Sequence, residues 1–247
     1  MNIVILTGAG ISAESGLGTF RSSGGLWEKF KIEDVATPMA WKKNPQLVLN
    51  FYNERRKQCK LAKPNKAHLA LAELANYHNV SIITQNIDDL HERAGSRNIT
   101  HLHGEILKAK TSELTREYYH IEKDIKLGDF NNGKDFYSYP ENEKIKLSYN
   151  SYDLIISTGA LSVYGNLNKA IPFVYGLLKD NGIFINSGVK DNLIGQVIGK
   201  VWHFKPKGLE EVIDVSRASQ FSDVEKIHIP LSLFLANLTE YMITAKK

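Results

Sequence analysis

Residues 84–105 read TQNIDDLHERAGSRNITHLHGE and bring several chemically useful side chains into one short stretch. Gln85, Asn86 and Asp88 carry compact amide and carboxylate groups, which suit hydrogen bonding to ribose hydroxyls and to a carboxamide. His103 follows, and a neutral imidazole can take a proton from a sugar hydroxyl near pH 7. His103 is therefore a candidate general base. The alternative is an ordinary surface or core histidine.

A second histidine in this stretch raises the question of a metal site. His101 and His103 stand at positions i and i+2, so they could form half of one. No third ligand is evident from the sequence. The chain has a single cysteine, Cys59, which excludes a cysteine zinc site and a disulfide within one chain. The sequence therefore predicts no metal site.

A glycine-rich stretch, GAGISAESGLGTFRSSGGLW at residues 8–27, follows an apolar run at Ile3–Leu6. Glycines directly after a first strand let the backbone turn tightly and let a diphosphate approach the N-terminus of the next helix. The pattern is not the usual G-x-G-x-x-G, so a purely structural turn is the alternative. Thr19, Phe20 and Arg21 add an aromatic ring and a guanidinium that can pair with phosphate, which favours nucleotide binding.

Four apolar runs are typical of buried parallel strands, and helical patterns lie between them. Strands are expected at Ile3–Leu6, Val80–Thr84, Asp153–Thr158 and Gly182–Asn186, and helices at Pro45–Cys59, Lys66–Tyr77 and Asn168–Lys179. Strands that alternate with helices predict an α/β fold with a mainly parallel sheet. In open sheets of this kind, ligands bind beyond the carboxyl ends of the strands, where residues 84–105 begin.

Residues 110–150 have a different character from the rest of the chain. They are polar, rich in Lys, Glu, Asn and Tyr, and carry turn signals without a sustained period. We expect a small module or mobile excursion between two parts of the sheet. The expected organisation is therefore 1–109, 110–150 and 151–247.

Composition and charge narrow the class of protein. The 247 residues carry 31 basic and 27 acidic side chains, and this small, scattered excess does not call for nucleic acid as a partner. No apolar run approaches a membrane span, and no secretory signal pattern is visible. The expectation is a cytoplasmic protein without a membrane or nucleic-acid partner. Its oligomeric state is not specified.

Taken together, GAGISAESGLGTFRSSGGLWE, TQNIDDLHERAG and HLHGEI resemble, in order and spacing, the NAD-dependent protein deacylases called sirtuins. The resemblance covers residues 1 to about 130 and is closest over the first 110. It implies a Rossmann-like domain with a small inserted module, NAD as the cofactor and an acyl-lysine protein or peptide as the substrate. The implied catalytic residues are His103, Asn86 and Asp88, and the implied cofactor-binding residues here are Gly8, Ala9, Gly10, Ala13, Thr19, Phe20, Arg21 and Gln85.

The resemblance also implies a reaction. The acyl oxygen of an acyl-lysine attacks the ribose C1′ and nicotinamide leaves. His103 then activates a ribose hydroxyl against the resulting imidate. The products are free lysine, nicotinamide and an O-acyl-ADP-ribose.

The stretch NFYNERRKQ at residues 50–58 bears on the acyl group. Tyr52 and Arg55 stand three residues apart, on one face of the expected helix. In sirtuins that prefer succinyl or malonyl groups, a Tyr-x-x-Arg pair in this region binds the distal carboxylate, and a phenol with a guanidinium is chemically suited to that task. The alternative is a charged helix face with one half-buried tyrosine.

Two departures from the sirtuin pattern are visible. Many sirtuins carry four zinc-binding cysteines after the His-Gly motif, and this chain has none there, so the module is expected to be metal-free, as in some bacterial sirtuin-like proteins. The Phe/Trp-Gly-Glu segment that pairs with the substrate peptide is not found in residues 133–150.

The C-terminal half has two resemblances. The stretch STGALSVYGN at residues 157–166 is similar to a late sirtuin segment, which places Gly159 at the NAD site, and Asn186 would reach the adenosine ribose. Residues 152–188 also resemble the late half of a class I methyltransferase, although no glycine-rich motif for S-adenosylmethionine precedes them. Three hypotheses stay open: an active deacylase favouring succinyl or malonyl groups, an impaired protein that binds NAD or ADP-ribose, and a sirtuin/methyltransferase hybrid.

Overall fold

The structure is a computed structural model. It describes residues 1–18, 30–111, 119–121, 123–127, 129–131, 134–137, 147–158, 166–193, 196, 206–229 and 240–247. Four predicted site residues, Thr19, Phe20, Arg21 and Gly159, lie outside the described residues.

The chain forms two compact units. The first contains Met1–Gly10, Glu73–Ile83 and Ile145–Lys247, and the second contains Ile11–Ala72 and Thr84–Lys144. Each unit gathers separate stretches of the chain, so neither corresponds to one of the three consecutive segments expected from the sequence. The expected division into three segments stays a prediction.

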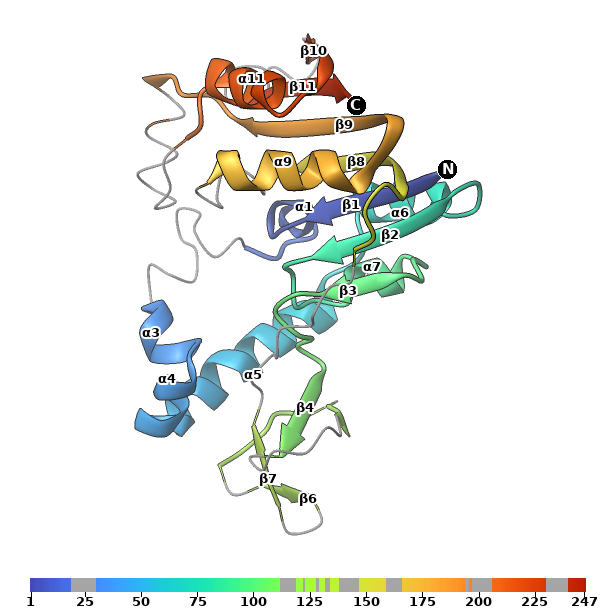
Figure 1. The fold of residues 1–247 in the computed structure, drawn as a ribbon. Helices are drawn as coiled ribbons and strands as arrows, with labels where there is room; N and C mark the ends of the chain where they lie inside the picture. Colours follow the sequence, from blue (N-terminus) through green and yellow to red (C-terminus); the bar gives the residue numbers. More distant parts are fainter. Residues whose placement is uncertain are drawn as a thin grey trace. The chain divides into compact units, whose positions relative to one another are not determined.

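The first unit is built on the main sheet (Figure 1). The strand order is β10-β11-β9-β8-β1-β2-β3, where β3 (Ile99–His101) belongs to the second unit. The other strands are β1 (Asn2–Thr7), β2 (Asn79–Thr84), β8 (Tyr152–Thr158), β9 (Leu178–Val189), β10 (Ser222–Ile227) and β11 (Glu240–Lys246). β8 is parallel to both β1 and β9, whereas β11 is antiparallel to β9 and to β10. The expected α/β fold with a mainly parallel, Rossmann-like sheet is confirmed.

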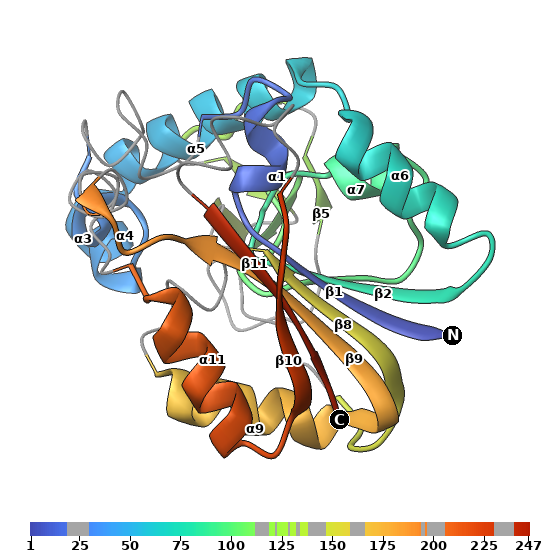
Figure 2. The same cartoon turned by 90° about the horizontal axis from the view of Figure 1, so that it is seen from above.

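Burial explains why the central strands read as continuous apolar runs. Ile3, Val4 and Ile5 of β1 are all buried, because successive side chains point to opposite faces and both faces are covered. Two helices, α9 (Leu167–Leu177) and α11 (Leu209–Ala218), lie side by side against the strands of this unit (Figure 2).

All four strands expected from the apolar runs are present, and two helix predictions are wrong at their ends. The expected helix at Asn168–Lys179 ends at Leu177, and Leu178 begins β9. Leu178 is buried and pairs with Tyr152 of β8, so the sheet contact outweighs the helical pattern. The helix expected at Lys66–Tyr77 is likewise shorter and ends at Leu74.

The second unit is mostly helical and carries a small sheet. Its helices, wholly or in large part, are α1 (Gly10–Ala13), α3 (Ile32–Val35), α4 (Pro38–Lys43), α5 (Pro45–Leu61), α6 (Lys66–Leu74) and α7 (Leu90–Arg93). The antiparallel sheet has the order β5-β4-β7-β6, with β4 (Lys108–Thr111), β5 (Tyr119–His120), β6 (Phe130–Asn131) and β7 (Lys134–Tyr137). Among the described residues, no helix of either unit is long and apolar enough to cross a membrane.

Helix α5 is the longest helix of the second unit, and its two ends are well capped. At its start, the Asn44 side chain accepts a hydrogen bond from the Leu47 N–H at 3.1 Å, and Pro45 occupies the first turn. At its end, the Arg93 guanidinium donates to the carbonyls of Cys59 and Ala62 at 2.7 and 2.6 Å. These contacts hold the helix that carries Tyr52 and Arg55.

Helix α5 also makes hydrogen bonds to the segments before and after β4. The Asn53 amide donates to the Ile125 carbonyl at 2.7 Å and accepts from the Ile125 N–H at 3.0 Å, so it occupies both backbone groups of that residue. Arg56 donates to Asn53 Oδ1 at 2.6 Å and to the Ile106 carbonyl at 3.0 Å. Leu49, Ala109 and Ile125 form a small buried cluster beside these bonds. Polar contacts to α5 and a few apolar side chains therefore tie this segment to the second unit.

We expect Asn53→Ala to lower the free energy of unfolding by about 2–4 kcal/mol, because it leaves the Ile125 backbone and the Arg56 guanidinium short of buried partners. The measurement is urea unfolding followed by circular dichroism. Asn50→Ala, on the exposed side of the same helix, is the matched control and should change stability by less than about 0.5 kcal/mol. Equal stability of the two variants would contradict the role assigned to Asn53.

Candidate functional site

The candidate site begins where the chain leaves β2 at Thr84. The backbone N–H of Asn86 donates to Thr84 Oγ1 at 3.0 Å, and the N–H of Leu90 donates to Asp88 Oδ1 at 3.2 Å. Short side chains that bond the backbone two residues away are typical of tight turns. The turn therefore places Asn86 and Asp88 in defined positions between β2 and α7.

Ser12, Asn86 and Asp88 form one buried hydrogen-bonded chain. The Ser12 hydroxyl donates to Asp88 Oδ2 at 3.0 Å, and the Asn86 amide donates to Ser12 Oγ at 3.0 Å. All three side chains are at most 5% exposed. The structure thus joins part of the glycine-rich stretch to the Gln-Asn-x-Asp stretch, which are more than seventy residues apart in the sequence.

The environment of Asp88 shifts the pKa of its carboxyl in two opposing ways. Burial raises the pKa of this carboxyl above its ordinary value, and the hydrogen bonds from Leu90 and Ser12 oppose the rise only in part. A buried carboxyl with a raised pKa is characteristic of functional sites.

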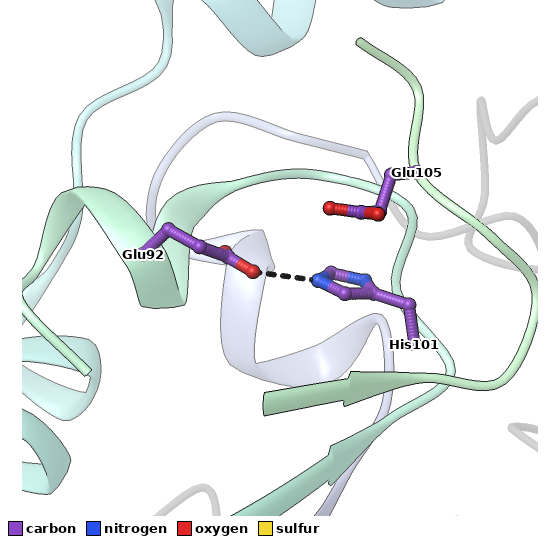
Figure 3. Close-up of side chains that lie close together, drawn as sticks. All are labelled: Glu92, His101 and Glu105. Carbon is purple, nitrogen blue, oxygen red and sulfur yellow. Dashed lines mark hydrogen bonds and ion pairs between the residues drawn. The ribbon is translucent and has the colours of Figure 1, made fainter. Parts of the chain in front are cut away.

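His101 is held from both of its ring nitrogens. Nδ1 lies 2.7 Å from the Asn86 carbonyl oxygen, and Nε2 lies 2.8 Å from Glu92 Oε1 (Figure 3). Because a carbonyl and a carboxylate oxygen only accept, both nitrogens carry a proton in this arrangement. Burial by itself lowers the pKa of His101, but the bonds to Glu92 and Asn86 outweigh it and leave that pKa raised. Although burial opposes the change, His101 also lowers the pKa of Glu92.

His103, the candidate base, has an exposed side chain and precedes Gly104, whose φ of +75° is in the region that favours glycine. Exposure leaves its imidazole accessible to a ligand. Its role as a base stays a prediction.

Tyr52 and Arg55 both lie in the buried part of α5. Each is 5% exposed, and the Arg55 guanidinium donates to Gln58 Oε1 at 3.4 Å. Burial lowers the pKa of Arg55, whereas attraction to Cys59, Asp88 and Tyr52 opposes that effect. The alternative of a charged helix face with one half-buried tyrosine is wrong, because both side chains are buried. The role of Arg55 toward an acyl group stays a prediction.

The other predicted site residues are spread over both units. Gly8, Ala9 and Gln85 are half-buried, and Gly10 and Ala13 are exposed on or beside α1. Asn186 is buried in β9, and its side chain hydrogen-bonds the Tyr241 hydroxyl. The roles of these residues in ligand binding stay predictions.

Three residues of the site were missed from the sequence. Ser12 is next to Ala13, which was predicted to bind the cofactor, but nothing in the sequence indicates that the Ser12 hydroxyl bonds to Asp88. Glu92 and Glu105 approach His101 in space, and their carboxylate oxygens and a His101 ring nitrogen lie within 4.8 Å of one another (Figure 3). Glu92, His101 and Glu105 are separated by nine and four residues, and they lie on a short helix, at a strand end and in a loop. These spacings match no regular period.

Comparison with known proteins identifies the family of this chain. The model of the Sir2 family matches residues 8–171, about two thirds of the chain and the whole of the stretch between Ser12 and His103. The chain belongs to the Sir2 family. Because the match runs to residue 171, it covers the first half of the stretch 152–188; the methyltransferase resemblance of that stretch stays a prediction.

Relatives within the Sir2 family include deacylases. An NAD-dependent protein deacylase of Helicobacter pylori strain 26695 is 51% identical over 173 residues, which cover 66% of this chain and 76% of that protein. The corresponding protein of strain J99 is 61% identical over 128 residues, which cover 52% of this chain and 55% of the relative. The chain thus spans only about half the length of the J99 relative that it matches.

Solved Sir2 structures share the fold. A complex of a mutant Sir2 homologue with ADP ribose superposes with a TM-score of 0.62 at 33% identity, covering 75% of this chain and 79% of that chain. A complex of a Sir2 homologue with NAD gives a TM-score of 0.60 at 29% identity and covers 88% and 90% of the two chains.

Two buried histidines in contact with each other lead to a prediction for the pH dependence of stability. The rings of His68 and His91 are both fully buried, with centroids 4.9 Å apart. Burial, with repulsion from His68 and His101, lowers the pKa of His91 from 6.5 to about 4. The unfolded chain therefore takes up this proton first as the pH falls, and the folded state loses stability between pH 6.5 and about 4.

We expect His91→Gln to remove up to about 3 kcal/mol of this acid-induced loss and so flatten the pH dependence of unfolding in that window. Urea unfolding at several pH values measures it. The exposed His120→Gln is the control and should keep the wild-type slope. A His91→Gln profile parallel to that of the wild type would refute the assignment.

Proposed function

We propose that this chain is an NAD-dependent protein-lysine deacylase, with NAD as cosubstrate and an acyl-lysine protein or peptide as substrate. The observation that carries the proposal is the buried chain Ser12–Asn86–Asp88, which unites the two sequence motifs of a Sir2 family member at the carboxyl end of β2. Relatives named NAD-dependent protein deacylase, at 51–61% identity, give independent support.

The donors and acceptors of the site fit a nicotinamide carboxamide. A primary carboxamide needs both an acceptor and a donor, and Asn86 offers both while Asp88 offers a carboxyl whose pKa is raised. At Gly10, an added Cβ would meet no atom of the described residues within 4 Å, which suits the close approach of a diphosphate. Bound NAD supplies an electrophilic ribose carbon and a leaving nicotinamide.

The chain's own residues have separate tasks in this proposal. Ser12 and Asn86 orient the Asp88 carboxyl, and His101 holds the backbone of Asn86 through its Nδ1–H. His103, exposed to solvent, takes a proton from a ribose hydroxyl once the acyl oxygen has bonded to the ribose and nicotinamide has left. One water molecule is consumed when the lysine amine leaves the acyl carbon. The products are free lysine, nicotinamide and an O-acyl-ADP-ribose.

The acyl group in this proposal is an acidic one, succinyl or malonyl. Arg55 is a guanidinium buried in helix α5, with the Tyr52 hydroxyl three residues before it. A carboxylate in such surroundings gains more from a charge-assisted hydrogen bond than it would in water. An acetyl group offers no charge for this contact, so it gains less.

The first test follows nicotinamide and free lysine together in purified protein with NAD and a succinyl-lysine peptide. Release of both in step supports the deacylase. Nicotinamide without lysine indicates NAD cleavage without delivery of the peptide, which would contradict the proposal.

We expect His103→Ala to reduce deacylation by about 10²–10⁴-fold, because the general base is lost, while NAD binding changes little. Initial rates and calorimetric NAD titration measure the two effects. His120→Ala removes another exposed histidine and should leave both unchanged. Equal loss of rate and NAD affinity in the His103 variant would eliminate its assignment as the base.

We expect Arg55→Met to reduce kcat/KM for a succinyl-lysine peptide by about 10–100-fold more than for an acetyl-lysine peptide, because one charge-assisted hydrogen bond is removed. Lys57→Met, an exposed cation two residues further along the same helix, is the matched control. If Arg55→Met affects the two substrates equally, the acidic-pocket hypothesis fails.

A second candidate concerns the end of the chain. Residues 172–247 lie beyond the Sir2 family match, and part of this region carries the methyltransferase resemblance. In a hybrid, NAD would bind poorly or not at all. Calorimetric titration with NAD and with S-adenosylmethionine separates the two candidates, since the deacylase binds only the first.

A further inference from the structure

Apart from the bond of His101 to the Asn86 backbone, the cluster of Glu92, His101 and Glu105 has no role in the proposed deacylation. Its members come from three segments of the second unit: α7, the last residue of β3 and the loop that follows it (Figure 3). One ligand atom from each lies within 4.8 Å of the other two. We propose that this cluster is a binding site for a divalent transition-metal ion of the Zn²⁺ type.

The orientation of His101 supports a metal site rather than a chance grouping of carboxylates. Its Nδ1 is committed to the Asn86 carbonyl at 2.7 Å, so its Nε2 is directed at the side where Glu92 lies. Metal-binding histidines characteristically donate their second ring N–H to a carbonyl or carboxylate, which fixes the ring and its tautomer. His101 already makes that outer contact through Nδ1.

Burial and exposure also fit an ion with an open coordination position. The His101 side chain is 4% exposed, whereas Glu92 is 37% exposed. The buried ring gives the cluster a rigid member, and the two glutamates have the freedom to close on an ion at about 2.0–2.2 Å. Three protein ligands leave room for water in a tetrahedral or five-coordinate arrangement.

The ligand set selects the class of ion. One imidazole nitrogen with two carboxylates suits Zn²⁺ and its neighbours in the first transition row. Ca²⁺ and Mg²⁺ prefer oxygen ligands throughout and gain little from an imidazole. The expected order of affinity is therefore Zn²⁺ above Mn²⁺, with Mg²⁺ and Ca²⁺ far weaker.

An ion must displace two existing partners. Glu92 pairs with His101, whose side chain is 4% exposed, and Glu105 pairs with Lys108, whose side chain is 49% exposed. The ion would take the place of the His101 Nε2 proton and of the Lys108 ammonium, and the exposed pair with Lys108 contributes little to stability. The ordinary alternative is that these residues form only the two ion pairs.

An ion at this position would connect the segments on either side of the candidate catalytic residues. The Leu102 N–H donates to the Thr84 carbonyl at 2.8 Å, and the Ile106 N–H donates to the Ile87 carbonyl at 2.7 Å. Cross-linking α7, His101 and Glu105 would make these bonds open less often. The metal site does not depend on the proposed deacylase activity, and it can be tested without NAD or peptide.

The test uses the untagged, chelator-treated chain of 247 residues. Calorimetric titration with Zn²⁺ should give one tight site, and Co²⁺ should give visible d–d absorption of four or five coordination. Glu92→Gln and Glu105→Gln should each weaken Zn²⁺ binding by more than about 100-fold, beyond the loss typical of an outer contact. Both variants keep His101 and its bond to Asn86, and thermal unfolding confirms that they fold.

His103→Ala is the matched control, because it removes the neighbouring exposed imidazole and should leave Zn²⁺ affinity unchanged. Hydrogen exchange gives a second measure: Zn²⁺ should slow exchange at Leu102 and Ile106 in the wild type but not in the Glu92→Gln/Glu105→Gln double variant. The proposal is overturned if no tight site is found, if the glutamate variants bind as the wild type does, if His103→Ala abolishes binding, or if Ca²⁺ binds as tightly as Zn²⁺.

Discussion

The candidate site depends on one requirement: polar groups that are removed from water must find partners inside the protein. Asp88, Asn86, Ser12 and His101 are all buried, and each is satisfied by another member of the group or by the backbone of the turn after β2. Because the partners are mutual, moving one side chain leaves another unsatisfied. The conformation of the segment between β2 and β3 is therefore determined largely by this network.

Helix α5 is the element that links the candidate acyl site to the rest of the second unit. Tyr52 and Arg55 belong to the turn that is proposed to select the acyl group, while Asn53 and Arg56, one residue later in each case, bond the chain near Ile106 and Ile125. Two adjacent arginines on one helix thus have different partners. The sequence has no cysteine after the His-Gly motif, and hydrogen bonds from α5 hold the chain there at Ile106 and Ile125.

Burial and neighbouring groups shift the pKa values of several titratable side chains in the second unit. Burial raises the pKa of Asp88 and lowers that of His91, because it opposes the charged form of each group. His101 behaves in the opposite way because Glu92 lies against it, and its pKa is raised. The pKa values of His91 and His101 are therefore shifted in opposite directions by their local surroundings.

Much of the architecture could be predicted from the sequence. Apolar runs such as Ile3–Leu6 marked every central strand, since a strand buried on both faces must be apolar throughout, and the family followed from motifs whose order and spacing survive in the linear chain. The tertiary structure alone decided that Leu178 enters a strand, that Ser12 bonds Asp88, and that Glu92 and Glu105 converge on His101. These contacts join residues from separate segments, and local pattern carries no signal for a partner that becomes a neighbour only when the chain folds.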